Sequence, residues 1–297
     1  MIRFAIYLAL ATVPATNATA QVRAAAPSPM VQHQHISIRD EGGTGPVVIL
    51  IPGLASPRAV YDGIVPTLRK THHVLTVEVN GFGGSDPGAN LKPGLLDGIV
   101  ADIAAHLADR GIDAPAIAGH SMGGLVAMML AVRHPGRVGR VMIIDALPFI
   151  GTLFDPAATA SNVAPRAAQM RNGIAAKHGA TRDAPAVTTD PGGIWSNTAA
   201  GRIQVANWSE RADQRVVAQA MYEDLTTDLR ADLPKIAVRP FHVLYATGAG
   251  PQAKAVWERD YAGSGATLVP VADSWHFIML DQPAAFERAM VHFLAAR

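Results

Sequence analysis

The sequence has no cysteine among its 297 residues, and only 16% of them are charged. The missing thiols exclude disulfide bonds, thiol catalysis and cysteine-based metal sites. Lys plus Arg number 25 against 24 Asp plus Glu, and no basic stripe appears, so we expect no nucleic-acid partner. Because 49% of the residues are hydrophobic, the sequence is instead typical of a compact globular protein with a large core.

The N-terminus lacks an apolar run long enough to span a membrane, which takes about 20 residues. A shorter apolar run, residues 4–13, follows the single basic residue Arg3. A small-x-small cleavage motif then ends at Ala20, before Gln21. These features predict that residues 1–20 are a signal peptide, with export to the periplasm or the medium and no membrane span after cleavage. An uncleaved apolar anchor is the alternative.

Beyond the signal peptide, residues 21–32 are rich in alanine and proline, and we expect them to form a loose leader. From residue 33 onward, strand-like apolar runs alternate with helical patterns. The expected strands are residues 35–38, 47–51, 73–79, 116–118, 138–144, 241–245 and 266–269. The expected helices are residues 59–69, 93–110, 121–133, 253–261 and 283–296. This alternation predicts an α/β fold with a mostly parallel central sheet and helices on both of its faces.

One segment, residues 146–235, breaks the alternation because it has helical patterns and no strand-like run. Its length is too great for an ordinary connection between two strands. We therefore expect a helical cap inserted between two strands of a core made of residues 33–145 and 236–297. The cap contains Trp195 and Trp208, which we expect to line the substrate pocket.

Residues 119–123 read Gly-His-Ser-Met-Gly, a Gly-x-Ser-x-Gly motif between a short apolar strand and a helix. In such a turn the serine adopts a strained conformation that lifts its hydroxyl above the sheet, and the flanking glycines let strand and helix approach. The helix N-terminus adds positive potential near a developing oxyanion. The motif predicts that Ser121 is a nucleophile. The alternative is a glycine-rich turn with an incidental serine.

Three stretches outside this turn extend the pattern. Residues 51–54 read Ile-Pro-Gly-Leu, residues 81–86 read Gly-Phe-Gly-Gly-Ser-Asp, and residues 274–277 read Ser-Trp-His-Phe. Together with the serine turn they resemble the oxyanion loop, the Gly-x-Gly-x-Ser turn and the late histidine loop of the α/β-hydrolase superfamily, in its capped branch. The resemblance covers nearly all of residues 35–296. It is specific to the fold and does not identify a substrate.

The resemblance implies that two backbone N–H groups, those of Leu54 and Met122, hold the oxyanion. The oxyanion loop usually reads His-Gly in this family and here has Pro52 and Gly53. The resemblance also implies that His276 is the base, since it lies in the loop between the last strand and the last helix. The chain order of serine before histidine is the order that this fold uses.

The acid departs from the commonest family pattern, because residues 246–251, where it usually lies, contain no carboxylate. Asp145 ends the preceding strand, at a position where some capped relatives carry their acid, and we assign it as the triad acid. Asp260, Asp273 and Glu258 remain alternatives. Asp145 could instead be a polar residue that hydrogen-bonds a loop at the strand end.

These residues predict a serine carboxylic ester hydrolase that cleaves an ester or lactone of a small to medium neutral substrate through an acyl-enzyme on Ser121. The same triad would serve a carbon–carbon bond hydrolase or an acyltransferase, and a non-catalytic ligand-binding member of the fold is a further alternative. A serine at this turn argues against dehalogenases and epoxide hydrolases, which need a carboxylate nucleophile. His33 and His35 have no third ligand nearby in the sequence, so we expect no metal, and no motif indicates a cofactor.

Overall fold

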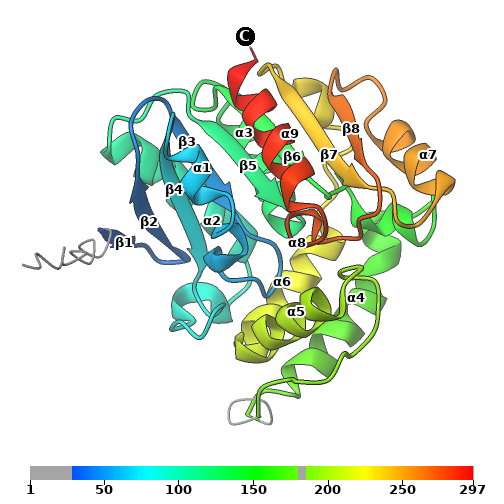
Figure 1. Cartoon of the computed structure of the whole chain (residues 1–297). Coiled ribbons are helices and arrows are strands. Elements are labelled where there is room, and N and C mark those ends of the chain that lie inside the picture. The colour runs from blue at the N-terminus through cyan, green and yellow to red at the C-terminus, as the bar shows by residue number, and fades with distance from the viewer. Residues whose placement is uncertain (1–28, 180–184, 297) are drawn as a thin grey trace, which may run out of the picture.

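The computed structural model describes residues 29–179 and 185–296. The expected signal peptide and most of the expected leader lie outside these residues. The centre of the described part is an eight-stranded sheet in the order β1-β2-β4-β3-β5-β6-β7-β8 (Figure 1). Its strands are β1 (Met30–Gln32), β2 (Ile36–Gly42), β3 (Val47–Ile51), β4 (His73–Val79), β5 (Ala116–His120), β6 (Arg140–Ile144), β7 (Phe241–Ala246) and β8 (Thr267–Val271).

The pairing within the sheet is antiparallel from β1 through β2 to β4 and parallel from β4 through to β8. Alternate side chains of the parallel strands enter two separate cores. One core lies against α2 (Leu95–Asp109), α3 (Met122–Arg133) and α7 (Pro251–Asp260). The other lies against α1 (Val65–Leu68), α8 (Ile278–Asp281) and α9 (Pro283–Ala295). The expected fold class, a mostly parallel sheet with helices on both faces, is confirmed.

Two local expectations differ from the structure. Residues 30–32, expected to belong to a loose leader, form β1, which pairs with β2 and places Val31 opposite Ile38. The backbone N–H and C=O groups on the outer edge of β2 can pair with any extended segment, so the side chains of residues 30–32 give no sign of this strand. The expected helix at residues 59–69 is instead the 3₁₀ turn η1 (Arg58–Tyr61) followed by α1, whose first turn contains a proline. Proline is tolerated at a helix start and not in a helix interior, so the two pieces stay separate.

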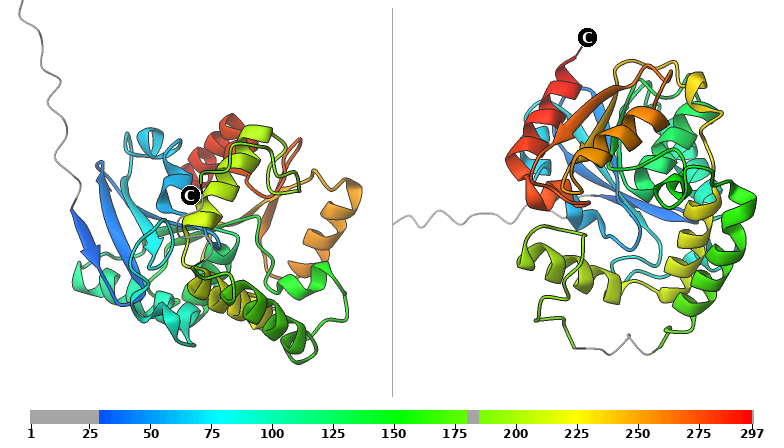
Figure 2. Two further views of the ribbon diagram at one scale, coloured as in Figure 1. Left: turned by 90° about the horizontal axis from the view of Figure 1, so that it is seen from below. Right: turned by 90° about the vertical axis from the view of Figure 1, so that its right-hand side faces the viewer.

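Between β6 and β7 the described residues form helices and no strand. These are η3 (Ile150–Leu153), α4 (Ala160–Ala175), α5 (Ala199–Arg211), α6 (Gln214–Thr226) and η4 (Leu233–Lys235). Helices α4 and α6 pack against each other at one end of the sheet, and α5 lies at the same end, apart from that pair (Figures 1 and 2). Helix α6 is fixed to the core because Asp213, at its N-cap, donates its backbone N–H to Gly81 O at 2.7 Å. No helix in the described ranges is long and apolar enough to cross a membrane.

Candidate active site

Ser121 lies at the turn between β5 and α3, with φ 54° and ψ −126°. A positive φ strains any residue other than glycine, so the neighbouring structure must hold this conformation. The backbone N–H of Ser121 donates to Ile144 O at 2.9 Å, and its carbonyl accepts the N–H of Gly124 at 2.7 Å. These bonds fix the serine between the end of β6 and the first turn of α3.

The glycines around Ser121 are required by close backbone approach. A Cβ on Gly119 would overlap the carbonyl oxygen of Gly123, and a Cβ on Gly123 would overlap that of Ile51. Strand and helix therefore meet at a distance that only glycine permits. This is the packing that the Gly-x-Ser-x-Gly spacing predicts.

His276 lies in the loop between β8 and α8, and its Nδ1 is 2.7 Å from Oδ2 of Asp145. The Asp145 carboxylate is itself oriented, because its Oδ1 accepts the backbone N–H of Ala246 at 2.8 Å. Asp145 also has a positive φ of 48°, directly after β6. With Nδ1 engaged by the carboxylate, Nε2 is the imidazole nitrogen left to act on a hydroxyl.

The three alternative acids have other surroundings. Asp260 is buried, accepts a hydrogen bond from Thr152 Oγ1 at 2.5 Å and pairs with Arg259 at 2.6 Å. Glu258 lies 3.5 Å from Lys254 on the surface of α7. Asp273 is exposed in the loop after β8, and its side chain makes no hydrogen bond to His276 among the described residues. The structure thus brings Asp145 to His276, while Asp260 and Glu258 have partners elsewhere.

The two expected oxyanion donors lie beside Ser121. Leu54 follows β3, and Met122 is the first residue of α3. Within the described part of the chain, neither N–H donates to a backbone carbonyl, so both donors are available to a ligand. A Cβ on Gly53 would come within 2.9 Å of His120 Nδ1 and 3.0 Å of Ser121 Cβ. A glycine there lets the loop with Leu54 approach the nucleophile.

His120 is hydrogen-bonded to the backbone of the loop that carries His276. Its side chain is buried, and its Nε2 donates to the backbone carbonyl of His276 at 2.9 Å. Burial, and then the proximity of His276, hold the pKa of His120 well below its usual range. His120 is therefore neutral at physiological pH and acts as a hydrogen-bond donor that fixes the backbone of the base.

Ser121, Asp145 and His276 line one cavity of about 70 Å³. The other lining residues are Leu125, Ala146, Leu147, Ile150, Leu153, Asp224 and Trp257. The lining is apolar apart from the three triad candidates and Asp224. The cavity is thus a small apolar chamber with the reactive groups on its wall.

The two expected pocket tryptophans lie near this cavity and are not among its lining residues. The Trp195 ring is 5.6 Å from that of His276, and Trp195 is half exposed. Trp208 is buried in the core and lies 6.1 Å from the Phe277 ring. Trp257, on α7 of the core, and Asp224, on α6, do line the cavity, and sequence reasoning missed both. No motif accompanies either residue, so only the fold reveals them.

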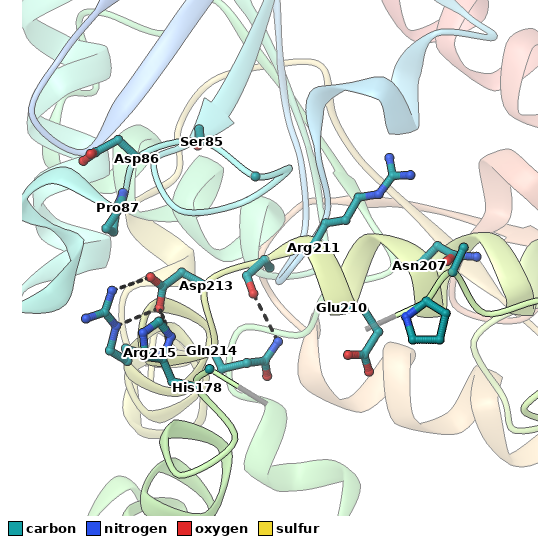
Figure 3. A pocket seen from close by; sticks show the side chains of 15 residues that line it. Ser85, Asp86, Pro87, His178, Asn207, Glu210, Arg211, Asp213, Gln214 and Arg215 are labelled. Atoms are coloured by element: carbon teal, nitrogen blue, oxygen red, sulfur yellow. Dashed lines mark hydrogen bonds and ion pairs between the residues drawn. The ribbon is translucent and has the colours of Figure 1, made fainter. Parts of the chain in front are cut away.

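A larger hollow of about 680 Å³ lies between the turn at residues 84–87 and residues 207–215, at the end of α5 and the start of α6 (Figure 3). Its lining mixes polar and apolar residues and includes Asp213 and Arg215, which pair at 2.7 Å. None of Ser121, His276 and Asp145 lines it. The smaller cavity is therefore the candidate active site, because Ser121, His276 and Asp145 line it.

Comparison with known proteins agrees with this geometry. The sequence model of the α/β hydrolase fold family matches residues 46–239. The chain belongs to this family. It is 33% identical over 104 residues to N-formylmaleamate deformylase of Pseudomonas putida, which is 35% of this chain and 38% of that protein. It is 35% identical over 106 residues to pimeloyl-[acyl-carrier protein] methyl ester esterase of Aeromonas hydrophila, 36% of this chain and 40% of that one.

The chain thus covers about two fifths of the length of these curated relatives. Among solved structures, the enol-lactonase of Burkholderia xenovorans LB400 superposes with a TM-score of 0.69 at 22% identity. That match covers 90% of this chain and 100% of the lactonase chain. At this identity the likeness is one of fold.

Proposed function

We propose that this protein is a serine hydrolase that cleaves a carboxylic ester or lactone of a small, neutral substrate. The observation that carries the proposal is that a strained Ser121 and a hydrogen-bonded His276–Asp145 pair open on the same cavity. A strained serine beside an oriented imidazole has the geometry of an activated nucleophile.

In the proposed reaction, Ser121 Oγ attacks the carbonyl carbon while His276 Nε2 takes its proton. Asp145 fixes the tautomer and stabilises the imidazolium that forms. The N–H groups of Leu54 and Met122 receive the negative oxygen, and losing one such donor costs about 3–4 kcal/mol of barrier. His276 then returns the proton to the departing alkoxide, and water releases the acyl group by the same steps.

No hydrogen bond joins the Ser121 hydroxyl to His276 among the described residues, and catalytic contacts of this kind commonly tighten only around substrate. The cavity volume of about 70 Å³ supports a small acyl group. The lining by Leu125, Leu147 and Trp257 supports an uncharged one. We propose Trp195 as a contact for the departing alcohol, because it is half exposed beside His276. Trp208 packs near Phe277, which in turn packs against His276, so we propose that Trp208 affects the base indirectly.

The test combines a fluorophosphonate probe with a chain-length series of p-nitrophenyl esters. The wild-type protein should be labelled at Ser121 and should hydrolyse the short esters fastest. Ser121→Ala should lose both properties, with turnover reduced by about 10⁵–10⁶-fold and an unchanged melting temperature. Full ester hydrolysis by a pure Ser121→Ala protein would contradict the proposal. An unlabelled wild-type protein would favour a ligand-binding role instead.

A further inference from the structure

Asp224 on α6 is a buried carboxyl in the active-site cavity that the proposed reaction does not use. Asp224 is 8% exposed, and it lines the cavity together with Ser121 and His276. Its side chain takes part in no hydrogen bond or ion pair among the described residues. Buried polar groups are nearly always satisfied, so a carboxyl left open to a cavity points to a partner supplied by a ligand.

The adjacent residue, Glu223, shows that α6 is held firmly. Its Oε1 accepts the backbone N–H of Gly94 at 2.7 Å, and its Oε2 accepts that of Leu96 at 2.8 Å. These bonds connect α6 to the N-terminus of α2, where a carboxylate is favoured by the helix dipole. The hydrogen bonds of Glu223 therefore hold α6 in place next to Asp224, which faces the cavity.

The chemistry of the cavity favours a neutral partner. Burial raises the pKa of Asp224 to about 7, and the proximity of His276 opposes that rise. The protonated carboxyl has an O–H to donate and faces a lining that is otherwise apolar apart from the triad. A cationic ligand would instead lie near the imidazolium that forms on His276, and that repulsion would oppose the reaction.

We propose that Asp224 determines specificity by donating a hydrogen bond to a keto or ether oxygen on the acyl group of the substrate. The inference rests on the proposed ester hydrolysis and refines its substrate class. The preferred ester or lactone has an oxygenated acyl chain, and its plain alkyl analogue is a poorer substrate because Asp224 is left unpaired.

The charged groups around Asp224 set the expected pH behaviour. His276 and Asp145 face it across the cavity, and the 3₁₀ turn η3 contributes no titratable residue. On the same helix, Glu223 faces α2, and Arg171 of α4 lies over the Tyr222 ring at 4.7 Å. Any effect common to all esters cancels in a ratio of two substrates, so the ratio isolates Asp224.

The experiment compares two pairs of p-nitrophenyl esters, methoxyacetate with butyrate and 4-oxopentanoate with 4-methylpentanoate. Each kcat/KM is divided by the rate of hydroxide-catalysed hydrolysis, which removes intrinsic reactivity. In the wild-type protein at pH 6, at least one oxygenated ester should be preferred by about tenfold or more. That preference should fall as the pH rises through about 7, because an ionised carboxylate cannot donate.

Asp224→Leu should abolish the preference while the alkyl esters are still hydrolysed. Asp224→Asn, which keeps a donor, should retain the preference and lose its pH dependence, so the test does not depend on the leucine variant folding. Asp228→Asn is the matched control and should leave both ratios unchanged, because Asp228 pairs with Arg230 and does not line the cavity. Equal ratios in the wild type and both Asp224 variants, with esters hydrolysed normally, would overturn this inference and leave the proposed function intact. Absence of all ester hydrolysis would overturn the proposed function as well.

Discussion

The buried carboxyl of Asp224 should make the stability of the fold depend on pH. Its pKa rises from the ordinary 3.8 to about 7 because the side chain is buried. Between those values the unfolded chain has lost the proton and the folded chain still holds it. The stability present below pH 3.8 is therefore lost as the pH rises through 7. The difference between a pKa of 3.8 and one of about 7 corresponds to a loss of unfolding free energy on the order of 4 kcal/mol.

Asp224→Asn removes the titration with almost no change in shape. Relative to the wild type, this variant should gain about 2–4 kcal/mol of unfolding free energy between about pH 4 and pH 8. Urea unfolding at a series of pH values measures the difference directly. Asp228→Asn is the control. Burial raises the pKa of Asp228, but its hydrogen bonds to Arg230 outweigh burial and lower the pKa below its ordinary value. Asp228 is therefore ionised in both states over this range, and the unfolding free energy of its variant should differ from that of wild type by a constant. Parallel curves for Asp224→Asn and wild type would refute the reasoning.

Three further outcomes are expected. Asp145→Asn should lower turnover by about 10⁴-fold at neutral pH with the fold intact, whereas Asp260→Asn should retain near-normal kcat in the same assay. Gly119→Ala should destabilise the protein by roughly 3 kcal/mol or more in thermal melts, because its Cβ overlaps a carbonyl oxygen, while Gly173→Ala, in open space on α4, should be neutral or slightly stabilising. Expression with the native N-terminus should yield exported protein that begins at Gln21 by N-terminal sequencing, and retention of residues 1–20 would indicate an anchor.

The elements that could be predicted are those with a local signal. Residues 47–51 and 73–79 coincide with β3 and β4. The first is a continuous apolar run and the second is rich in valine, and short runs of this kind between turns are typical of strands buried on both faces. The turn at Ser121 could be predicted because the spacing of its glycines indicates that the backbones of a strand and a helix are in close contact. Expected strand 116–118 is extended to His120 in β5, since the ladder with β6 continues up to the nucleophile. The two added residues, Gly119 and His120, do not continue the apolar run, so the sequence does not predict that the strand includes them.

The residues that could not be predicted depend on which segments the fold brings together. Asp224 stands beside Glu223 in the sequence, and the two adjacent carboxylates look alike on a helix. In the structure one binds the N-terminus of α2 and the other faces the cavity, since residues one apart on a helix point in different directions. Trp257 resembles any apolar residue of a core helix. Its place beside Ser121 follows from the sheet order, which no short window of sequence contains.

The position of the acid follows from how the strand ends are joined. Ser121 donates its N–H to Ile144 O at the end of β6, and the next residue, Asp145, donates its own N–H to Leu244 O of β7 at 2.7 Å. Ser121 and Asp145 are therefore both held at the end of β6. The segment after β7 lacks a carboxylate. The last residue of β7, Ala246, instead contributes a backbone N–H that orients Asp145 Oδ1. The residue after β6, Asp145, thus supplies the carboxylate that contacts the His276 imidazole, and the end of β7 supplies the hydrogen bond that orients this carboxylate.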